Sequence, residues 1–94
     1  MKVRIRYFAV VRELAGRVQE TVEVAESTNL LDLLRLLANK YGEQMEKYIL
    51  DLSSNTPRPI LRYVVNGMTI STSADFAKIL GEGSVVSILP TQGG

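Results

Sequence analysis

Residues 29–42, NLLDLLRLLANKYG, decide the fold because they predict the one long helix of this 94-residue chain. Apolar residues recur there at intervals of three and four, which places them along one helix face: Leu30, Leu33, Leu34, Leu37 and Tyr41. The N-cap residues Ser27-Thr28-Asn29 precede the run, and Gly42 follows its last turn. Haem, lipid or coiled-coil contacts are alternative roles for the leucines. The run is too short for sustained heptads, which favours packing against a core.

The segments before this helix predict two strands close enough in sequence to pair in antiparallel. Residues 2–8, KVRIRYF, alternate between apolar and polar, so Val3, Ile5 and Tyr7 face the core. Phe8 falls on the outer, otherwise basic, side of this strand. Residues 10–15 and 19–24 then indicate a short helical turn and a second alternating strand; Gly16 ends the turn.

Three short segments after the long helix carry weaker signals. Residues 43–52 have apolar residues at the spacing of a short second helix, with Leu52 on its apolar face. Residues 53–59, SSNTPRP, have the composition of a loop. Residues 74–80, ADFAKIL, indicate one more helical turn. These segments therefore connect the main elements and do not define the fold.

The remaining segments predict three further strands. Residues 60–65 and 68–70 flank Asn66-Gly67, which is typical of a tight type I′ hairpin. Residues 84–89, SVVSIL, are nearly all apolar, as expected for a strand at the centre of a sheet. A strand pair, one long helix and three more strands predict an α+β protein, with one sheet of about five strands and its helix on one face. We expect one domain, residues 1–94, that ends in a tail, residues 90–94.

Composition limits the possible functions. Hydrophobic residues make up 46% of the chain and charged residues 22%, as in a soluble globular domain. The net charge of +1 lacks the basic excess of a typical nucleic-acid binder. The sequence contains no recognisable signal peptide and no apolar run long enough to span a membrane. We therefore expect a cytoplasmic protein that binds neither nucleic acid nor membrane.

The residue types that carry most side-chain catalysis are missing. The chain contains no Cys and no His, so it has no catalytic thiol, no thiolate metal ligand and no imidazole base. No acidic cluster has the spacing of a calcium-binding loop. Gly81-Glu82-Gly83-Ser84 resembles a fragment of a phosphate-binding loop, but neither a lysine nor a helix follows it. We expect no metal site, no bound cofactor and no catalysis by the chain alone.

The remaining chemical group is the C-terminus. Gly93-Gly94 lies a few residues beyond the most apolar strand, so we expect the base of the tail to be anchored and its end to project. Glycine has no Cβ, so this backbone fits a channel too narrow for other residues. The Gly94 carboxylate, with a pKa of about 3.3–3.7, is ionised at neutral pH. It becomes an acyl donor only after activation, for example by adenylation. A frayed end without function is the alternative.

Four segments together resemble the MoaD/ThiS family of sulfur carriers, and its MoaD branch most closely, over essentially the whole chain. They are VRIRYFAVVRELAG at residues 3–16, the leucine-rich helix, VVNG at residues 64–67 and GEGSVVSILPTQGG at residues 81–94. The resemblance implies the ubiquitin-like β-grasp fold. It also implies the role of a small subunit of molybdopterin synthase, which donates sulfur and is not catalytic alone.

The resemblance further implies a reaction cycle centred on Gly94. A MoeB-like, E1-like enzyme uses ATP to adenylate the Gly94 carboxylate, and sulfur transfer converts the acyl-adenylate into a thiocarboxylate. The tail then inserts into a MoaE-like large subunit, within a heterotetramer, where the sulfur builds the molybdopterin dithiolene. The inserting residues are Pro90, Thr91, Gln92 and Gly93.

In the family, residues on the outer sheet face and beside the tail contact the partners, and the matching positions here are Phe8, Leu89 and Arg12. An isolated apolar residue at the surface, which is common, is the alternative for Phe8. The usual family tail reads Pro-Pro-Val-x-Gly-Gly, whereas residues 90–94, PTQGG, are one residue shorter and more polar. One extended residue spans about 3.3 Å, so the reach of the terminus changes.

The acceptor of the acyl end therefore stays open. A ubiquitin-related protein modifier and a ThiS-like thiamin sulfur donor use the same chemistry at Gly94. A non-covalent interaction module, which uses the fold and not the tail, is the alternative from another class.

Overall fold

The long helix predicted from the leucine spacing is α2, Leu30–Tyr41, in the computed structural model, which describes residues 1–54 and 56–91. Its first turn carries a capping box. Asn29 Oδ1 accepts a hydrogen bond from the Asp32 N–H at 2.7 Å, and Asp32 Oδ2 accepts one from the Asn29 N–H at 3.2 Å. The predicted apolar face is confirmed, because its leucines are buried together with one alanine: Leu30, Leu33, Leu34, Leu37 and Ala38.

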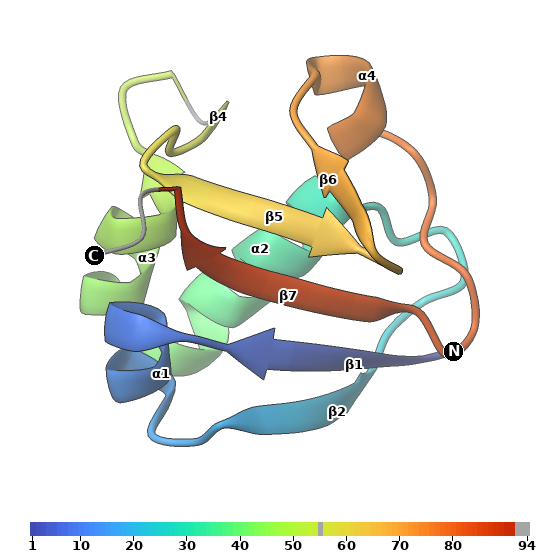
Figure 1. Ribbon diagram of the computed structural model, residues 1–94, viewed down its shortest axis with the longest axis horizontal. Coiled ribbons are helices and arrows are strands. Elements are labelled where there is room, and N and C mark those ends of the chain that lie inside the picture. Colours follow the sequence, from blue (N-terminus) through green and yellow to red (C-terminus); the bar gives the residue numbers. More distant parts are fainter. Residues whose placement is uncertain (55, 92–94) are drawn as a thin grey trace.

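Five strands form one mixed sheet in the order β2-β1-β7-β5-β6 (Figure 1). They are β1 Lys2–Tyr7, β2 Gln19–Glu23, β5 Leu61–Val65, β6 Met68–Ile70 and β7 Val85–Pro90. β1 and β7 run parallel, and the other neighbouring strands run antiparallel. The predicted pairing of the first two strands and the central place of the last strand are confirmed.

The sheet buries one face. Side chains of β1 and β7 that point to this inner face are fully buried: Val3, Ile5, Tyr7, Val86 and Ile88. Val85 and Leu89 point to the outer face of β7 and are only half-buried. The apolar run in β7 therefore reflects its central position in the sheet, and the described helices cover β7 on one side only.

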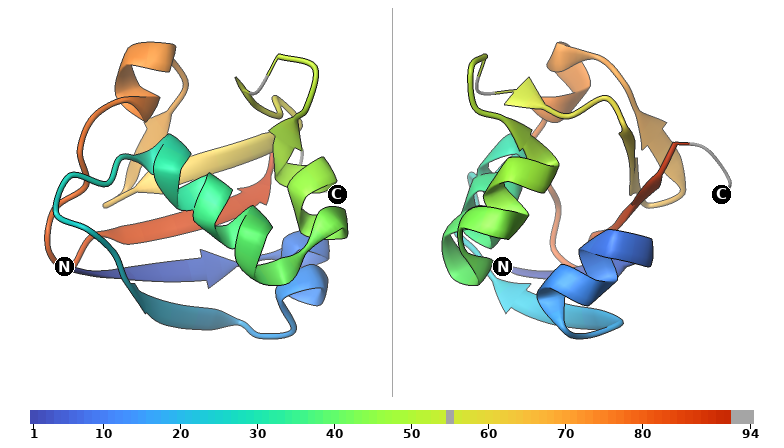
Figure 2. Two further views of the ribbon diagram at one scale, coloured as in Figure 1. Left: turned by 180° about the vertical axis from the view of Figure 1, so that it is seen from behind. Right: turned by 90° about the vertical axis from the view of Figure 1, so that its left-hand side faces the viewer.

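Helices cover the inner face and one end of the sheet (Figure 2). α2 crosses the inner face, and α3, Glu43–Ile49, packs against α2. α1, Ala9–Ala15, lies at the end of the sheet where β1 and β7 finish (Figure 1). The middle of the outer face has no helix over it in the described part of the chain. None of the described helices is long and apolar enough to cross a membrane.

The predictions for residues 43–59 are wrong in detail. The helix α3 ends at Ile49, and the next two residues form β3, Leu50–Asp51, which pairs with β4, Thr56–Pro57. Part of the predicted loop is therefore a two-stranded ribbon. Asp51 Oδ1 accepts hydrogen bonds from the N–H and Oγ of Ser53, which closes the turn at the ribbon's end. Leu52 is 52% exposed and does not belong to the helix face.

The predicted turn at residues 74–80 is shorter than expected. It forms a single turn, α4, Ser73–Phe76, whose N-cap is Thr72. The hairpin prediction is confirmed, because Asn66 and Gly67 have φ angles of 51° and 85°, both in the positive range of a type I′ turn. Asn66 Oδ1 also accepts a hydrogen bond from the Val85 N–H at 2.8 Å, which ties this turn to β7.

Candidate functional site

The tail starts from a fixed point in the middle of the sheet. β7 ends at Pro90, and Thr91 donates from both its N–H and its Oγ1 to the Ile60 C=O, at 3.1 Å each. Pro90 is half-buried and Thr91 is exposed. The chain is therefore held against the start of β5 up to Thr91. Three of the predicted site residues lie outside the described residues: Gln92, Gly93 and Gly94.

Phe8 and Leu89 lie at matching ends of two adjacent parallel strands. Tyr7 stands opposite Ile88 in the β1–β7 register, and Phe8 and Leu89 are the residues that follow them. Both side chains are half-buried. The Arg6 guanidinium lies 5.5 Å from the centroid of the Phe8 ring, within cation–π range. The structure thus brings these two predicted residues to the base of the tail, and their contact with a partner stays a prediction.

A strained turn separates Phe8 from the helix that follows. Phe8 is the N-cap of α1, and the next residue, Ala9, has a φ of 54°. This left-handed conformation costs a residue with a Cβ about 1–2 kcal/mol. The alternation predicted that Phe8 is the last residue of the strand. The structure shows instead that Phe8 is the junction between β1 and α1. The turn directs α1 toward the end of β7, which it contacts (Figure 1).

Arg12 lies on the exposed surface of α1. Its backbone C=O accepts the hydrogen bond of the Gly16 N–H at 2.9 Å, so its backbone helps to end the helix. Within residues 1–54 and 56–91, its guanidinium forms no hydrogen bond and no ion pair. Its predicted role in partner binding also stays a prediction.

The outer face around Leu89 is more basic than the sequence reasoning recognised. Arg62 of β5 stands opposite Leu89, and Arg4 of β1 stands opposite Val85. Arg4, Arg6 and Arg62 are all exposed. Half-buried apolar side chains of β7 therefore lie between cations on both sides, a surface suited to a partner with acidic residues. Alternation in residues 2–8 predicts that Arg4 and Arg6 of β1 lie on the outer face, and this prediction is confirmed. The place of Arg62 depends on the β5–β7 pairing, which has no local signal.

Glu20 is a carboxylate with several donors, on the inner side of β2. Tyr7 and Tyr41 each donate a hydroxyl hydrogen bond to Glu20 Oε2. Lys40 Nζ lies 2.6 Å and Arg17 Nη1 3.4 Å from Glu20 Oε1. The Glu20 side chain is 6% exposed, which opposes its ionisation, yet hydrogen bonds from Lys40 and the two tyrosines hold its pKa below the usual value. The carboxylate is therefore fully engaged in structure and is not available as a base.

The same cluster keeps its tyrosines neutral. Burial, followed by the hydrogen bond to Glu20, raises the pKa of Tyr7 far above its ordinary value, so the hydroxyl stays protonated at neutral pH. Burial and then Glu20 also raise the pKa of Tyr41. Across the described residues, no three potential metal-ligating side chains come together. The candidate site is accordingly the base of the tail with the outer-face residues beside it.

Comparisons with known proteins fit this arrangement. The model of a family described as the ThiS family matches residues 5–94. A search of curated proteins found no match. A putative molybdopterin converting factor, subunit 1, from Pyrococcus furiosus is 26% identical, with a TM-score of 0.74 over 96% of this chain and 97% of that one.

Two further solved structures share the fold. The small archaeal modifier protein 1 from Methanosarcina acetivorans is 24% identical, with a TM-score of 0.77 over 99% of this chain and 96% of that one. A chain of the complex of subunits 1 and 2 of molybdopterin-converting factor from Helicobacter pylori 26695 is 20% identical, with a TM-score of 0.61 over 100% and 99%. The expected ubiquitin-like β-grasp fold is thus confirmed.

Proposed function

Because the chain belongs to the ThiS family of ubiquitin-like sulfur carriers, we propose that it is the sulfur-donating small subunit of a molybdopterin synthase. The observation that carries this proposal is the extent of the family match, which runs from residue 5 through the terminal Gly93-Gly94. The likeness to the Pyrococcus furiosus protein supports the choice of pathway. The Helicobacter pylori complex of two subunits supports a MoaE-like partner.

The proposed chemistry takes place at the Gly94 carboxylate. One of its oxygens attacks the α-phosphate of ATP on an E1-like enzyme, and pyrophosphate leaves, which yields an acyl-adenylate. A sulfide nucleophile then attacks the acyl carbon and AMP leaves, so that a C–S bond replaces the C–O bond to the adenylate. The large subunit transfers this sulfur to the pterin precursor, and water restores the carboxylate.

The contribution of the chain itself is to hold and present the acyl end. The two hydrogen bonds from Thr91 to the Ile60 C=O fix the base of the tail against β5. Gly93 and Gly94 carry no Cβ, so a narrow channel in the partner can admit them. Phe8, Leu89 and Arg12 provide the proposed contact surface beside the tail. Activation comes from the partner enzymes, because the chain has no Cys or His to supply a thiol or an imidazole.

Mass spectrometry of the intact chain tests this proposal. After incubation with ATP, the E1-like enzyme of the same organism and sulfide, we expect the mass to rise by the difference between sulfur and oxygen. Deletion of Gly94 should remove the increase. Arg35→Ala is the matched control, because Arg35 is exposed on α2, across the sheet from the outer face. An unchanged mass, with an E1-like enzyme shown to hydrolyse ATP in the presence of the chain, would refute the proposal.

A second assay tests the acceptor. The thiocarboxylated chain, mixed with the MoaE-like subunit and the sulfur-free pterin precursor, should form the dithiolene product. The chain without Gly94 should form none. A ThiS-like role predicts instead that the same thiocarboxylate supports thiazole formation for thiamin and fails with the pterin precursor.

A protein modifier is the second candidate, and the polar, shortened tail together with the likeness to the Methanosarcina acetivorans modifier protein favours it. This function shares the activation step but joins Gly94 to lysine amines of target proteins. Immunoblots of cells that express the tagged chain distinguish the two. Gly94-dependent adducts of higher mass would support the modifier. Their absence, with normal molybdopterin formation, would reject it.

A further inference from the structure

The strand β2 forms one edge of the sheet and pairs with β1 alone. In Figure 1 it lies at the lower margin of the molecule, with no described helix or strand below it. An exposed strand edge offers backbone N–H and C=O groups to an additional strand. Which groups β2 offers depends on how its hydrogen bonds to β1 alternate.

Hydrogen bonds at the two ends of the β1–β2 pair show which residues of β2 face away from β1. The Tyr7 N–H donates to the Val18 C=O at 2.8 Å. At the other end, the Val24 N–H donates to the Met1 C=O, also at 2.8 Å. Residues of an antiparallel strand bond alternately to its two sides, so the even-numbered residues from 18 to 24 face β1. The backbone groups of the outward residues take part in no hydrogen bond among the described residues: Gln19, Thr21 and Glu23.

Charged side chains at a sheet edge normally keep other strands away. The two glutamates of β2 are each offset within their own chain. Glu20 points to the inner face, where two tyrosines and Lys40 hold its carboxylate. Glu23 lies on the outer face, opposite Lys2 of β1. Neither carboxylate therefore stands uncompensated at the edge.

A second copy of β2 is complementary to this edge. When two copies pair in antiparallel about a two-fold axis at Thr21, each Thr21 stands opposite the other. Gln19 then stands opposite Glu23 of the second copy, and the same pair repeats on the other side of the axis. A threonine pair and an amide–carboxylate pair can each form a side-chain hydrogen bond across the strands, and no two like charges stand opposite each other. Val18, which is 59% exposed, comes to lie opposite Val24 of the second copy.

The next strands extend this complementarity. Arg6 of β1 stands opposite Gln19 in the β1–β2 register. In the joined sheet, each Glu23 therefore has Lys2 of its own chain on one side and Arg6 of the other chain, two strands away, on the other side. Association thus brings a carboxylate of each chain toward the basic outer face of the other.

The opposite edge strand, β6, offers much less. Val65 and Met68 flank the two-residue turn and bond to each other, so within β6 the Thr69 backbone groups are the ones that face away from β5. One outward residue is too few to hold an additional strand, because each outward residue supplies a single pair of hydrogen bonds.

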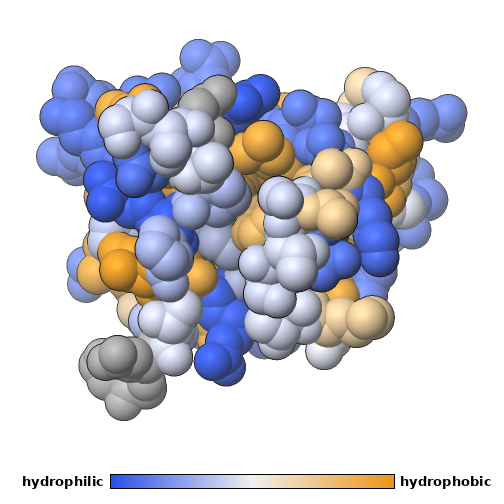
Figure 3. Space-filling view, turned by 90° about the horizontal axis from the view of Figure 1, so that it is seen from above, coloured by the Kyte–Doolittle hydropathy of each residue, from blue (hydrophilic) through white to orange (hydrophobic). Residues whose placement is uncertain are grey.

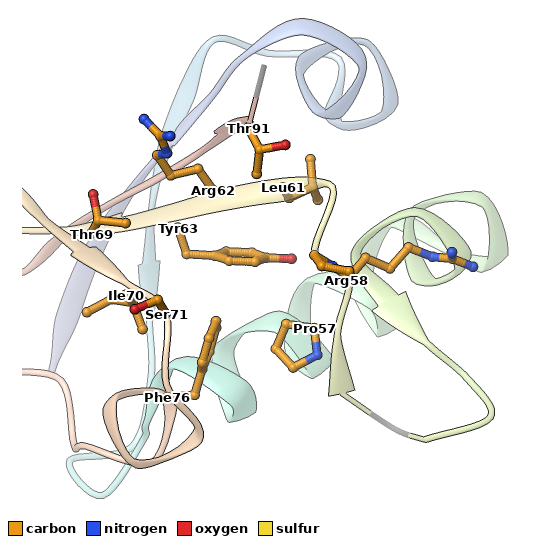
Figure 4. Close-up of a pocket in the computed structure, with 11 residues that line it drawn as sticks. Pro57, Arg58, Leu61, Arg62, Tyr63, Thr69, Ile70, Ser71, Phe76 and Thr91 are labelled. Carbon is orange, nitrogen blue, oxygen red and sulfur yellow. The ribbon is translucent and has the colours of Figure 1, made fainter. Parts of the chain in front are cut away.

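The apolar cavity beyond the end of β6 also lacks a free strand edge. It has a volume of about 310 Å³, and the Tyr63 and Phe76 rings meet edge to face in its wall, with centroids 5.3 Å apart (Figure 4). Figure 3 looks down on this side of the molecule and shows apolar residues near its middle. The Leu61 N–H donates to the Arg58 C=O at 3.3 Å, and the β5–β7 register turns the Arg62 backbone groups toward β7. Of the two sheet edges, β2 is therefore the one that offers a run of free backbone groups.

We propose that two copies of this chain associate through β2, so that their two sheets form one continuous sheet. Backbone hydrogen bonds of Gln19, Thr21 and Glu23 hold the two strands together, and the side-chain pairs fix their register. β1 separates β2 from β7, whose end carries the tail, so association leaves both tails accessible. The pair presents two C-terminal tails at once, and a partner with two suitably spaced binding sites gains affinity from this arrangement.

Sedimentation equilibrium of the full chain tests the proposal. We expect the average mass to rise from that of one chain toward that of two between about 10 µM and about 1 mM, as for a small, weak interface. Hydrogen exchange followed by nuclear magnetic resonance should show slower exchange of the Gln19, Thr21 and Glu23 amides at the higher concentration. The Thr69 amide, at the other edge, should be unaffected. Deletion of Gly93-Gly94 should leave the association unchanged, so this test does not depend on the proposed function.

Three substitutions locate the interface. Thr21→Pro removes an outward N–H that β1 does not use, so the fold is retained and association should weaken about tenfold or more. Thr69→Pro, the same change at the outward residue of β6, is the matched control and should associate like the wild type. Gln19→Lys should strengthen association about threefold or more, because it places a cation opposite Glu23 of the second copy, and Gln19→Glu should weaken it by a similar factor.

Circular dichroism melts confirm that each variant is folded. The proposal is overturned if the wild-type chain keeps the mass of one copy at about 1 mM, or if Thr69→Pro weakens association as much as Thr21→Pro. Equal association of Gln19→Lys and Gln19→Glu would also overturn it, because Gln19 would then not face Glu23 of the second copy.

Discussion

Replacing Glu20 by alanine removes an acceptor that joins the sheet to the end of α2. Tyr7 lies in β1, and Tyr41 and Lys40 lie in the last turn of α2. All three donate to the Glu20 carboxylate, which belongs to β2. The substitution leaves the Tyr7 hydroxyl, in a residue that is 0% exposed, without this partner. We therefore expect the largest loss of stability for any single polar side chain discussed above.

The magnitude follows from the environment of each donor. A hydrogen bond to a charged group contributes about 1.5–3 kcal/mol, and the two tyrosine bonds lie in the protected part of the cluster. The Lys40 side chain is 42% exposed, so its ion pair adds well under about 1 kcal/mol. The substitution also removes the free-energy cost of burying the Glu20 carboxylate, which offsets part of the lost stability. We expect Glu20→Ala to lower the free energy of unfolding by about 2–4 kcal/mol, or the melting temperature by about 10–25 °C.

Urea unfolding followed by circular dichroism measures this loss. Lys40→Met is the matched control, because it removes only the exposed donor and should cost less than about 1 kcal/mol. The wild-type chain should also lose stability on acidification. Glu20 has a folded pKa below its ordinary value of 4.5, so its contribution is complete above pH 4.5 and disappears as the pH falls through the folded pKa. A Glu20→Ala variant within about 0.5 kcal/mol of wild type at pH 7 would refute the reasoning.

Three further predictions concern the core, the strained turn and the contact surface. Leu34→Ala, at a residue that is 0% exposed on α2, should lower the free energy of unfolding by about 2–5 kcal/mol in urea; a loss below about 1 kcal/mol would contradict its place in the core. Ala9→Gly should raise stability by about 0.5–1 kcal/mol, because it relieves a φ of 54°, and a lower melting temperature would argue against strain at this residue. Phe8→Asp should keep the melting temperature but weaken binding to the proposed MoaE-like partner about tenfold or more by calorimetry; equal affinity would refute the proposed place of Phe8 in the interface.

Elements with local signals could be predicted from the sequence. The helix α2 has its leucine spacing, its capping residues and Gly42 within one short run, and the hairpin has Asn66-Gly67 between two β-rich segments. The strand β1 alternates with a period of two, which also identified its buried face. The fold class could be predicted because the order of these elements, a strand pair, a helix and further strands, is typical of an α+β protein with one sheet. Of the candidate site, the anchored base of the tail could be predicted because β7 is the most apolar strand.

Features that depend on long-range pairing could not be predicted. The ribbon of β3 and β4 contains prolines and serines typical of a loop, and only its pairing makes it a strand pair. Arg62 joins the outer surface because β5 lies beside β7, which no local pattern specifies. Phe8 was assigned to the strand because alternation does not reveal the positive φ at Ala9. Three of the donors to Glu20, namely Tyr7, Lys40 and Tyr41, lie more than ten residues away in the sequence, so its burial was also missed.

The parallel pairing of β1 and β7 has a mechanical consequence. β1 starts at one end of this strand pair and β7 finishes at the other (Figure 1), so tension between residue 1 and Thr91 acts along the strands and loads all their hydrogen bonds at once. A ladder loaded in this way must slide as a unit, whereas one pulled from the side opens bond by bond. Single-molecule stretching from residue 1 to Thr91 should therefore require a much higher force than stretching from residue 1 to Glu23, because β2 would peel from the edge. A partner that draws on the tail would pull in the resistant direction.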